Sequence, residues 1–440
     1  MKTISKNFPT IVIKYLDKYG SDKWHLKCNQ EKLFDNVIVV PAVAEHENIQ
    51  KLLHSLKHND GKYFDRTLIL FVINNCKSAS VEVKRENQLT ISFVNNLLID
   101  SAINIGFIDA STDGNSMPDK EGGVGLARKI GMDLALKLFD YNSSYKKLLI
   151  CLDADCLVQK NYLSTIVETF NNRKLSAAVI NYEHLLTEND FEKSAIISYE
   201  IFLRYYVLGL TYAGSPFAFH SVGSTMVCDF ESYIKIGGMN KCKAAEDFYF
   251  LEKLAKQTII YKISGTTVFP SSRGSWRVPF GTGQRINRFK AGTHDEYLLF
   301  DMKAFDVLKK WISLFHSKSV LTGSEYLSQA EQVEPALALF LKLNSFEVQW
   351  DKILLNAKTE SQIQKQKTIW FDGFRTMKLI HYLRDNVYPN INMFDALDDL
   401  FKKINFHPHI IRNKAIPSIE VQLLYLTNLK EAESVLTKLH

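Results

Sequence analysis

The chain has 440 residues, which is longer than one typical domain and predicts two or three structural units. Its composition, 46% hydrophobic and 23% charged residues, is that of an ordinary globular protein and excludes a largely disordered chain. The net charge of +6 is small for this length, so it does not indicate a nucleic-acid-binding protein, but it suits contact with anionic small molecules or an anionic membrane surface.

The cysteines and the apolar segments bear on cellular location. Six cysteines occur without a CxxC pair, which predicts reduced thiols, no disulfide framework and no zinc site. The N-terminal apolar piece, Ile11-Val12-Ile13, is too short for the core of a signal peptide. Residues 196–213 form the most apolar window, but Glu200 and Arg204 interrupt it, so we expect no membrane span. We therefore expect a cytoplasmic protein, for which peripheral contact with the inner face of the membrane stays open.

The first half of the chain alternates between strand-like and helix-like segments. Residues 1–34 are polar and rich in lysine, without clear periodicity, and we expect them to be a short extension. Residues 36–41 are an apolar run that ends in proline, which predicts the first strand. The next segment has apolar residues at i, i+3, i+4 and i+7, which predicts a helix. These residues are Ile49, Leu52, Leu53 and Leu56.

Three further strands are predicted at residues 67–73, 103–109 and 147–153. Helices predicted in residues 76–100 and 126–139 separate them. Strands that alternate with helices indicate a parallel sheet with right-handed crossover connections. The predicted fold class is therefore α/β, with a mostly parallel sheet flanked by helices.

The remainder of the chain is less regular. Its predicted segments are a helix at 161–170, a strand at 177–181, a long aromatic-rich helix at 191–210, a strand at 221–227, a helix from 246 and short strands at 259–263 and 266–269. From about residue 291 the alternation stops, and amphipathic helical patterns continue. We expect an N-terminal extension (1–34), an α/β domain (35–290) and a mainly α-helical C-terminal domain (291–440).

Asp153 and Asp155 follow an apolar run at the end of a predicted strand, with Ala154 between them. Residues two apart on an extended chain share a face, and open α/β sheets bind ligands at the carboxyl ends of their strands. Two hard oxygen ligands suit a divalent ion that keeps some waters and holds phosphate oxygens. The alternative is an ordinary turn, because aspartate is a favoured turn residue.

Four short patterns occur in a fixed order along the chain. They are Val37-Ile38-Val39-Val40-Pro41 with Glu45, Asp153-Ala154-Asp155, Gly237-Gly238-Met239, and Glu246-Asp247 ahead of a helix. Their order and spacing resemble the family 2 nucleotide-sugar glycosyltransferases, which have the GT-A fold, over residues 36–290. The resemblance implies a GT-A-like catalytic domain that moves a sugar from a nucleotide-diphosphate sugar to a hydroxyl acceptor. The acceptor would be a glycan, a lipid-linked sugar or a small molecule, as in polysaccharide or glycoconjugate biosynthesis.

The resemblance implies a nucleotide site at the ends of the first two strands. The loop that frames the nucleotide corresponds to Pro41, Ala42 and Glu45. The acidic residue that reads the base in the family is replaced here by Asn74, followed by Asn75. This difference leaves the base open, because an amide both donates and accepts hydrogen bonds whereas a carboxylate only accepts them.

Arg128, in the glycine-rich start of a helix, matches an arginine of the family. A helix N-terminus with Arg128 and Lys129 suits an anion. The alternative is a glycine loop with exposed basic side chains.

Further along, Arg277 and Arg285 are the basic residues expected to contact phosphate. The Gln-x-x-Arg-Trp pattern of processive polymer synthases is missing, because Gln284 and Arg288 are one residue too far apart, with Phe289 after them.

The resemblance also implies the metal and the base. Asp155 would bind Mg²⁺ or Mn²⁺ directly, with Asp153 near the ribose or a metal-bound water, and the metal would neutralise the leaving diphosphate. Asp247 would be the general base of an inverting transfer, beside Glu246. The alternative for this acidic pair is favourable charge at a helix N-terminus. His294 is the first candidate for a further metal ligand, and His220 is the second.

Other classes of protein compete with this interpretation. A phosphatase of the haloacid dehalogenase type would use Asp153 as nucleophile, but that motif normally opens its domain, and here strands precede it. A sugar nucleotidyltransferase would need a glycine-rich loop after the first strand, and residues 41–45 contain no glycine. A catalytically inactive nucleotide-sugar-binding scaffold is the non-enzyme alternative. The C-terminal domain could form a homo-oligomer, contact a membrane surface or bind the acceptor.

Overall fold

The computed structural model describes residues 8–99, 101–272 and 282–437. The chain divides into two compact units. The first consists of Met1–Leu185 and Ser221–Gln284, and the second of Leu186–His220 and Arg285–His440. No helix in the described part of the chain is both long and apolar enough to cross a membrane.

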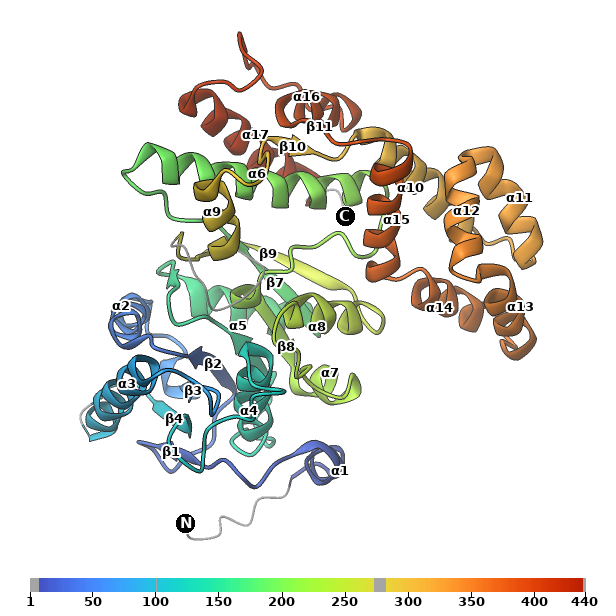
Figure 1. The fold of residues 1–440 in the computed structure, drawn as a ribbon. Coiled ribbons are helices and arrows are strands. Elements are labelled where there is room, and N and C mark those ends of the chain that lie inside the picture. The colour runs from blue at the N-terminus through green and yellow to red at the C-terminus, as the bar shows by residue number, and fades with distance from the viewer. Residues whose placement is uncertain (1–7, 100, 273–281, 438–440) are drawn as a thin grey trace. The chain divides into compact units, whose positions relative to one another are not determined.

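The first unit is built on one sheet of nine strands, in the order β1-β4-β3-β2-β5-β8-β7-β9-β6. Figure 1 labels β1 to β4 and β7 to β9 of this sheet. The strands are β1 (Leu26–Cys28), β2 (Asn36–Ala42), β3 (Thr67–Asn74), β4 (Ile105–Ala110), β5 (Leu148–Cys151), β6 (Leu157–Val158), β7 (Ala177–Tyr182), β8 (Met226–Asp229) and β9 (Ile260–Phe269). The ladder from β4 through β3 and β2 to β5 is parallel, and so is the pairing of β7 with β9. The remaining pairs are antiparallel. The α/β prediction is confirmed, with a mixed sheet whose longest ladders are parallel.

Helices cover both faces of this sheet. They are α1 (Thr10–Tyr19), α2 (His46–Lys57), α3 (Val81–Ile99), α4 (Val124–Ala135), α5 (Tyr162–Arg173), α7 (Phe230–Lys235) and α8 (Glu246–Ala255), with short 3₁₀ turns η1 (Phe64–Arg66) and η2 (Gly223–Thr225). Every residue of β2 and β3 is buried, as expected of strands covered on both faces. The predicted helical face of α2 is confirmed, because Ile49, Leu52, Leu53 and Leu56 are all buried.

The strand order places a topological switch point between β2 and β5. The chain steps from β2 to β3 and then to β4 on one side, and returns to pair β5 on the other side of β2. In open α/β sheets, ligands bind in the crevice at the carboxyl ends of the two strands beside such a point. Here those ends lead into the loop after Ala42 and into Asp153.

The segment expected to be an N-terminal extension contains two elements of the first unit. Strand β1 pairs antiparallel with β4 and forms one edge of the sheet. Helix α1 buries Val12 and Tyr15. The apolar face of α1 is hard to recognise in the sequence, because it has few residues and the exposed face carries Lys14 and Lys18.

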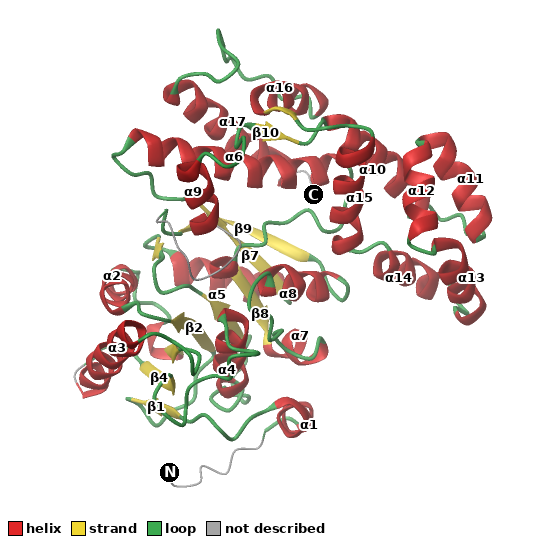
Figure 2. Cartoon of the chain, viewed as in Figure 1, coloured by secondary structure: helices red, strands yellow, loops and turns green. Residues whose placement is uncertain are grey.

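The second unit is almost entirely helical (Figure 2). Its helices are α6 (Asp190–Tyr212), most of α9 (Thr282–Ala291), α10 (Met302–Phe315), α11 (Gly323–Val333), α12 (Pro335–Leu343), α13 (Phe346–Asn356), α14 (Glu360–Trp370), α15 (Gly373–Asn386), α16 (Met393–Lys403) and α17 (Ile419–Thr437), and strands β10 (Leu298–Leu299) and β11 (Ile391–Asn392) pair. The helical C-terminal region is thus confirmed. Helix α6 belongs to this unit as well, because its Ile197, Ile201 and Tyr205 pack in the core of the unit with Trp311. The functional domain limits at residues 34 and 290 stay predictions.

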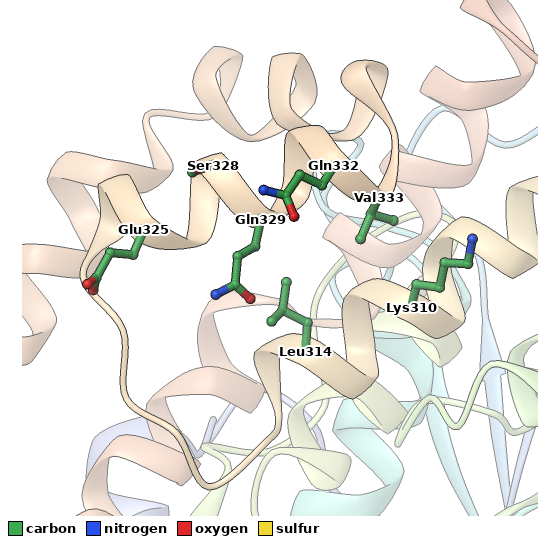
Figure 3. Close-up of a pocket in the computed structure, with 7 residues that line it drawn as sticks. All are labelled: Lys310, Leu314, Glu325, Ser328, Gln329, Gln332 and Val333. Carbon is green, nitrogen blue, oxygen red and sulfur yellow. The ribbon is translucent and has the colours of Figure 1, made fainter.

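A surface pocket of about 550 Å³ lies between α10 and α11 in the second unit (Figure 3). Leu314 and Val333 are its only aliphatic lining residues, and the others are polar. The polar ones are Lys310, Glu325, Ser328, Gln329 and Gln332. Glu325 is engaged by the capping box that begins α11, so its carboxylate is already bonded to Thr322.

Candidate active site

The Asp153-Ala154-Asp155 stretch lies in the turn that follows β5. The strand ends at Cys151, earlier than predicted, so the two aspartates do not share a face through strand alternation. Ala154 is buried in the core of the first unit and anchors the turn. Asp153 and Asp155 are half-buried on either side of it. The turn therefore presents both carboxylates at the edge of the core, beside the switch point.

Arg128 joins this turn to the Glu246-Asp247 motif. Its side chain is 2% exposed, and its Nη2 atom lies 2.5 Å from Oδ1 of Asp153. Its Nη1 atom donates to Oε1 of Glu246, a residue 118 positions away in the sequence. A buried guanidinium is costly unless it is paired and hydrogen-bonded, and these two carboxylates supply that pairing. The predicted anion-binding arginine thus holds two acidic motifs together.

Close packing around the guanidinium holds the Arg128 side chain in one position. Gly223, in η2, lies directly against the guanidinium, and a Cβ atom added there would overlap Nη2. The turn η2 leads into β8, which pairs with β5. The sheet therefore sets the distance between this glycine and the Asp153 turn, and a side chain larger than hydrogen at position 223 would displace the guanidinium.

Glu246 and Asp247 form the first turn of α8. Ala245, which precedes them at the N-cap position, has a left-handed backbone with φ of 59°. Burial raises the pKa of Glu246 to about 7, and the neighbouring carboxylate of Asp247 acts in the same direction, against the opposing charge of Arg128. Burial also raises the pKa of Asp247, again against the effect of Arg128. The Oδ1 atom of Asp247 accepts a hydrogen bond of 2.8 Å from the backbone N–H of Phe248.

The charge balance of this cluster favours a further cation. One guanidinium faces the carboxylates of Asp153, Glu246 and Asp247, and Asp155 lies two residues from Asp153. Among residues 8–99, 101–272 and 282–437, no group of three or more His, Cys, Asp or Glu side chains is arranged to hold a metal. Mg²⁺ and Mn²⁺ bound with a substrate phosphate need only one or two protein carboxylates. The oxygen donors of Asp153 and Asp155 fit that kind of ion.

The loop after β2 is held by a buried network of three asparagines. Asn87, from α3, accepts a hydrogen bond from the backbone N–H of Ala44 (2.9 Å) and donates to Oδ1 of Asn75 (2.7 Å). Asn74 donates to the carbonyl of Ala42 (3.1 Å). Ala44 has a left-handed backbone with φ of 50°. The amide donors of both Asn74 and Asn75 are thus engaged with the protein's own backbone, at Ala42 for Asn74 and at Cys76 and Ser111 for Asn75. Asn74 holds the loop directly, and Asn75 holds it through Asn87.

The other predicted nucleotide residues of the first unit lie at the same edge. Pro41 and Ala42 are the last two residues of β2, and both are buried. Glu45 is 6% exposed, and it accepts a hydrogen bond of 2.5 Å from Asn48. Asn87 was missed by the sequence analysis, because an asparagine on a helix of mixed charge looks like an ordinary surface residue.

The predicted residues of the second unit have partners or surroundings of their own. Arg285 is paired with the buried Glu296, and its guanidinium lies 4.9 Å from the ring centroid of Phe202. His220 is buried, with Nε2 2.9 Å from Oε1 of Glu433. His294 is exposed and bonds Thr293. Arg277, which precedes the Arg285–His440 segment of this unit in the sequence, lies outside the described residues. The roles of Arg285, Arg277 and His294 stay predictions.

Substituting Glu246 with glutamine is expected to change how stability depends on pH. Its pKa rises from an ordinary 4.5 to about 7 on folding, so the protonated carboxyl stabilises the folded state. That contribution is complete below pH 4.5 and is lost as the pH rises through 7. Between these values, the free energy of unfolding should fall more for the wild type than for Glu246→Gln. Urea denaturation at several pH values measures this difference.

The exposed Glu47 of α2 provides the control for this measurement. Glu47→Gln should follow the wild type at every pH. Parallel curves for the wild type and Glu246→Gln would contradict the assignment of this titration to Glu246.

Comparison with known proteins gives distant structural similarity only. No protein-family model matches the chain, and no curated protein matches it. TarS 1-349 from S. aureus in complex with UDP-GlcNAc is 12% identical, with 91% of this chain and 91% of that chain covered and a TM-score of 0.38. The mannosyltransferase PcManGT from Pyrobaculum calidifontis in complex with GDP-Man and Mn²⁺ is 10% identical, with 96% and 93% covered and a TM-score of 0.34. GalNAc-T7 with UDP, GalNAc and Mn²⁺ is 15% identical, with 82% and 59% covered and a TM-score of 0.37.

All three TM-scores are below 0.5, so these similarities do not assign the chain to a class. With identities of 15% or less and TM-scores of 0.38 or less, the similarity carries no weight for substrate, metal or mechanism.

Proposed function

We propose that the protein is a glycosyltransferase that moves a sugar from a nucleotide-diphosphate sugar to a hydroxyl acceptor. One observation carries the proposal: Arg128 joins Asp153, at the end of β5, to Glu246, at the start of α8. This places two acidic motifs beside the switch point of the sheet, where open α/β folds bind ligands. A site rich in carboxylates, with a single buried cation, suits a metal-bound diphosphate.

Each residue of the cluster has a proposed task. Asp155 and Asp153 would hold Mg²⁺ or Mn²⁺, which supplies charge neutralisation to the diphosphate leaving group when it is bound. Arg128 holds Asp153 and Glu246 next to each other. The loop of Pro41, Ala42 and Glu45, braced by Asn74 and Asn75, would frame the nucleotide.

Asp247 is the proposed general base of an inverting, family 2-like transfer. It would take the proton of the acceptor hydroxyl as that oxygen bonds to the anomeric carbon. The bond between this carbon and the diphosphate oxygen breaks in the same step, and the nucleoside diphosphate leaves. A base has to be ionised to accept a proton, so the raised pKa of Asp247 predicts a transfer rate that increases with pH.

The phosphatase alternative has less support from the same contacts. A nucleophilic Asp153 would need a carboxylate oxygen directed at phosphorus. Its Oδ1 atom is instead 2.5 Å from the buried guanidinium of Arg128, so only Oδ2 is left for attack, and the positive charge of Arg128 makes that oxygen a weaker nucleophile. An inactive scaffold would bind the same donor without turnover, and assays of binding and transfer separate the two.

Nucleotide diphosphates are expected to stabilise the protein in the presence of Mn²⁺. A ligand at 100 times its dissociation constant stabilises the folded state by about 2.7 kcal/mol. UDP and GDP, each with and without Mn²⁺, should be compared by thermal shift. We expect a metal-dependent increase in Tm for at least one of them, and the loss of this increase in Asp155→Ala.

Asp17 provides a matched control, because it is an exposed aspartate in the same unit. Asp17→Ala should keep the full response. If no nucleotide diphosphate stabilises the wild type, or if Asp155→Ala responds like the wild type, the metal and nucleotide assignments are wrong. A phosphoryl group trapped on Asp153 would establish the phosphatase instead.

A further inference from the structure

Helix α4, which carries Arg128, is buried on nearly all sides. Ten of its 12 residues are buried, including the charged residues Arg128, Lys129 and Asp133. A helix at the surface of a domain normally buries one apolar stripe and exposes the rest. Such complete burial means that several neighbours, and not the sheet alone, determine the rotation of this helix.

The sheet and the acidic cluster account for two sides of α4. Gly131 lies on the sheet, where an added Cβ atom would overlap the side chains of Val39 and Val72. Arg128 faces Asp153 and Glu246. Neither set of contacts involves Lys129 or Asp133, whose charges need partners elsewhere.

Two of those partners come from outside α4, Tyr15 from α1 and Tyr233 from α7, and Lys129 and Asp133 also pair with each other. The carboxylate of Asp133 accepts hydrogen bonds from the hydroxyls of Tyr15 (2.9 Å) and Tyr233 (2.6 Å), and from the ammonium group of Lys129 (2.8 Å). Lys129 also donates to the Tyr15 hydroxyl, at 3.2 Å. All four residues are buried. A buried polar network of this kind has a single geometry in which every group is partnered.

The Gly237-Gly238 turn explains how Tyr15 reaches this position. Both glycines have left-handed backbones, with φ of 78° and 77°. A Cβ atom added to Gly238 would overlap the hydroxyl oxygen of Tyr15. Gly238, which has no role in the proposed chemistry, thus leaves the space that the Tyr15 hydroxyl fills.

We propose that α1 is a positioning element of the catalytic cluster. Through Tyr15 and Asp133, it holds α4 in the rotation that keeps Arg128 between Asp153 and Glu246. Tyr15, Asp133 and Lys129 are positioning residues, because they act through Arg128. The catalytic consequence of this arrangement rests on the proposed function, but the restraint on α4 does not.

Hydrogen–deuterium exchange of α4 in Tyr15→Phe tests the proposal without any assay of activity. A hydrogen bond to a charged group contributes a factor of about ten or more to a local opening equilibrium. We expect the backbone amides around Arg128 to exchange at least about tenfold faster in Tyr15→Phe than in the wild type. Strands β2 and β3 should keep their wild-type rates.

Tyr141→Phe is the matched control, because it deletes the same hydroxyl from a tyrosine that bonds the residue just after α4 and takes no part in the Asp133 network. That hydroxyl donates to the carbonyl of Leu136 at 2.8 Å. Tyr141→Phe should leave the exchange around Arg128 unchanged. Tyr233→Phe, which removes the second hydroxyl on Asp133, should behave like Tyr15→Phe.

The possible results separate this proposal from the proposed function. Wild-type exchange around Arg128 in Tyr15→Phe would overturn the restraint on α4, and so would faster exchange spread over the whole unit, which reports general destabilisation. Locally faster exchange supports it, even in a protein that binds no nucleotide diphosphate, and that last finding contradicts the proposed function alone. If UDP or GDP does bind, its affinity should fall in Tyr15→Phe and not in Tyr141→Phe.

Discussion

Arg128→Met is expected to destabilise the protein by about 1–3 kcal/mol, because the buried Glu246 and the half-buried Asp153 both lose the guanidinium that they share. Asp153 and Glu246 lie against the guanidinium, which is 2% exposed. Methionine fills a similar volume but carries no charge. Nucleotide diphosphate binding should be lost with it, because the Asp153 turn and the start of α8 are no longer joined. Urea denaturation and thermal shift measure the two effects.

Two further variants separate the loss of charge pairing from simple damage to the core. Arg85→Met removes an exposed arginine of α3 and should change stability by less than about 0.5 kcal/mol. Adding Asp153→Asn and Glu246→Gln to Arg128→Met removes the unpaired charges, and we expect this triple variant to regain much of the lost stability. Equal stability of Arg128→Met and the wild type would show that the contacts of Arg128 do not stabilise the fold.

Asp247→Asn is expected to reduce sugar transfer by a factor of about 10²–10⁴ while donor binding stays within about twofold of the wild type. Asparagine keeps an oxygen that can accept the hydrogen bond from Phe248, so the start of α8 should retain its geometry. It cannot take a proton from the acceptor hydroxyl. Single-turnover rates and calorimetric titration of the nucleoside diphosphate measure transfer and binding separately.

The pH dependence of the wild type offers an independent check on the base. Burial raises the pKa of Asp247, so the fraction of ionised base increases with pH through a value above that of an exposed aspartate. The transfer rate should increase over the same range. Undiminished transfer by Asp247→Asn would remove Asp247 from the role of base.

Local sequence patterns were sufficient to predict the strands of the sheet and the helices that pack on it. Strands β2 and β3 are apolar runs buried on both faces, and α2 has a regular apolar stripe, so each pattern has one structural solution. The position of Asp153 after a strand followed from the same periodicity. These features depend on residues that are close together in the sequence.

The partners of the charged residues could not be predicted in this way. Arg128 and Glu246 are 118 residues apart, and their pairing depends on how α4 and α8 pack. The sequence favoured an anion-binding Arg128 because glycines precede it at a helix start, and that pattern contains no information about buried carboxylates. The role of helix α1 was missed for a similar reason. The hydrogen-bond partner of Tyr15 is Asp133, which is 118 positions away in the sequence.

The segment Leu186–His220 has a consequence for the order in which the protein can be assembled. It belongs to the second unit, yet it precedes β8, which pairs with both β5 and β7 in the sheet of the first unit. During synthesis, the sheet therefore stays incomplete until α6 has been made, and α6 in turn precedes every other helix of its own core. A fragment that stops at residue 290 keeps Ile197, Ile201 and Tyr205 but lacks Trp311 and the rest of the core that covers them. Neither unit is a contiguous piece of the gene product, so each can be separated only by rejoining the chain across the insertion.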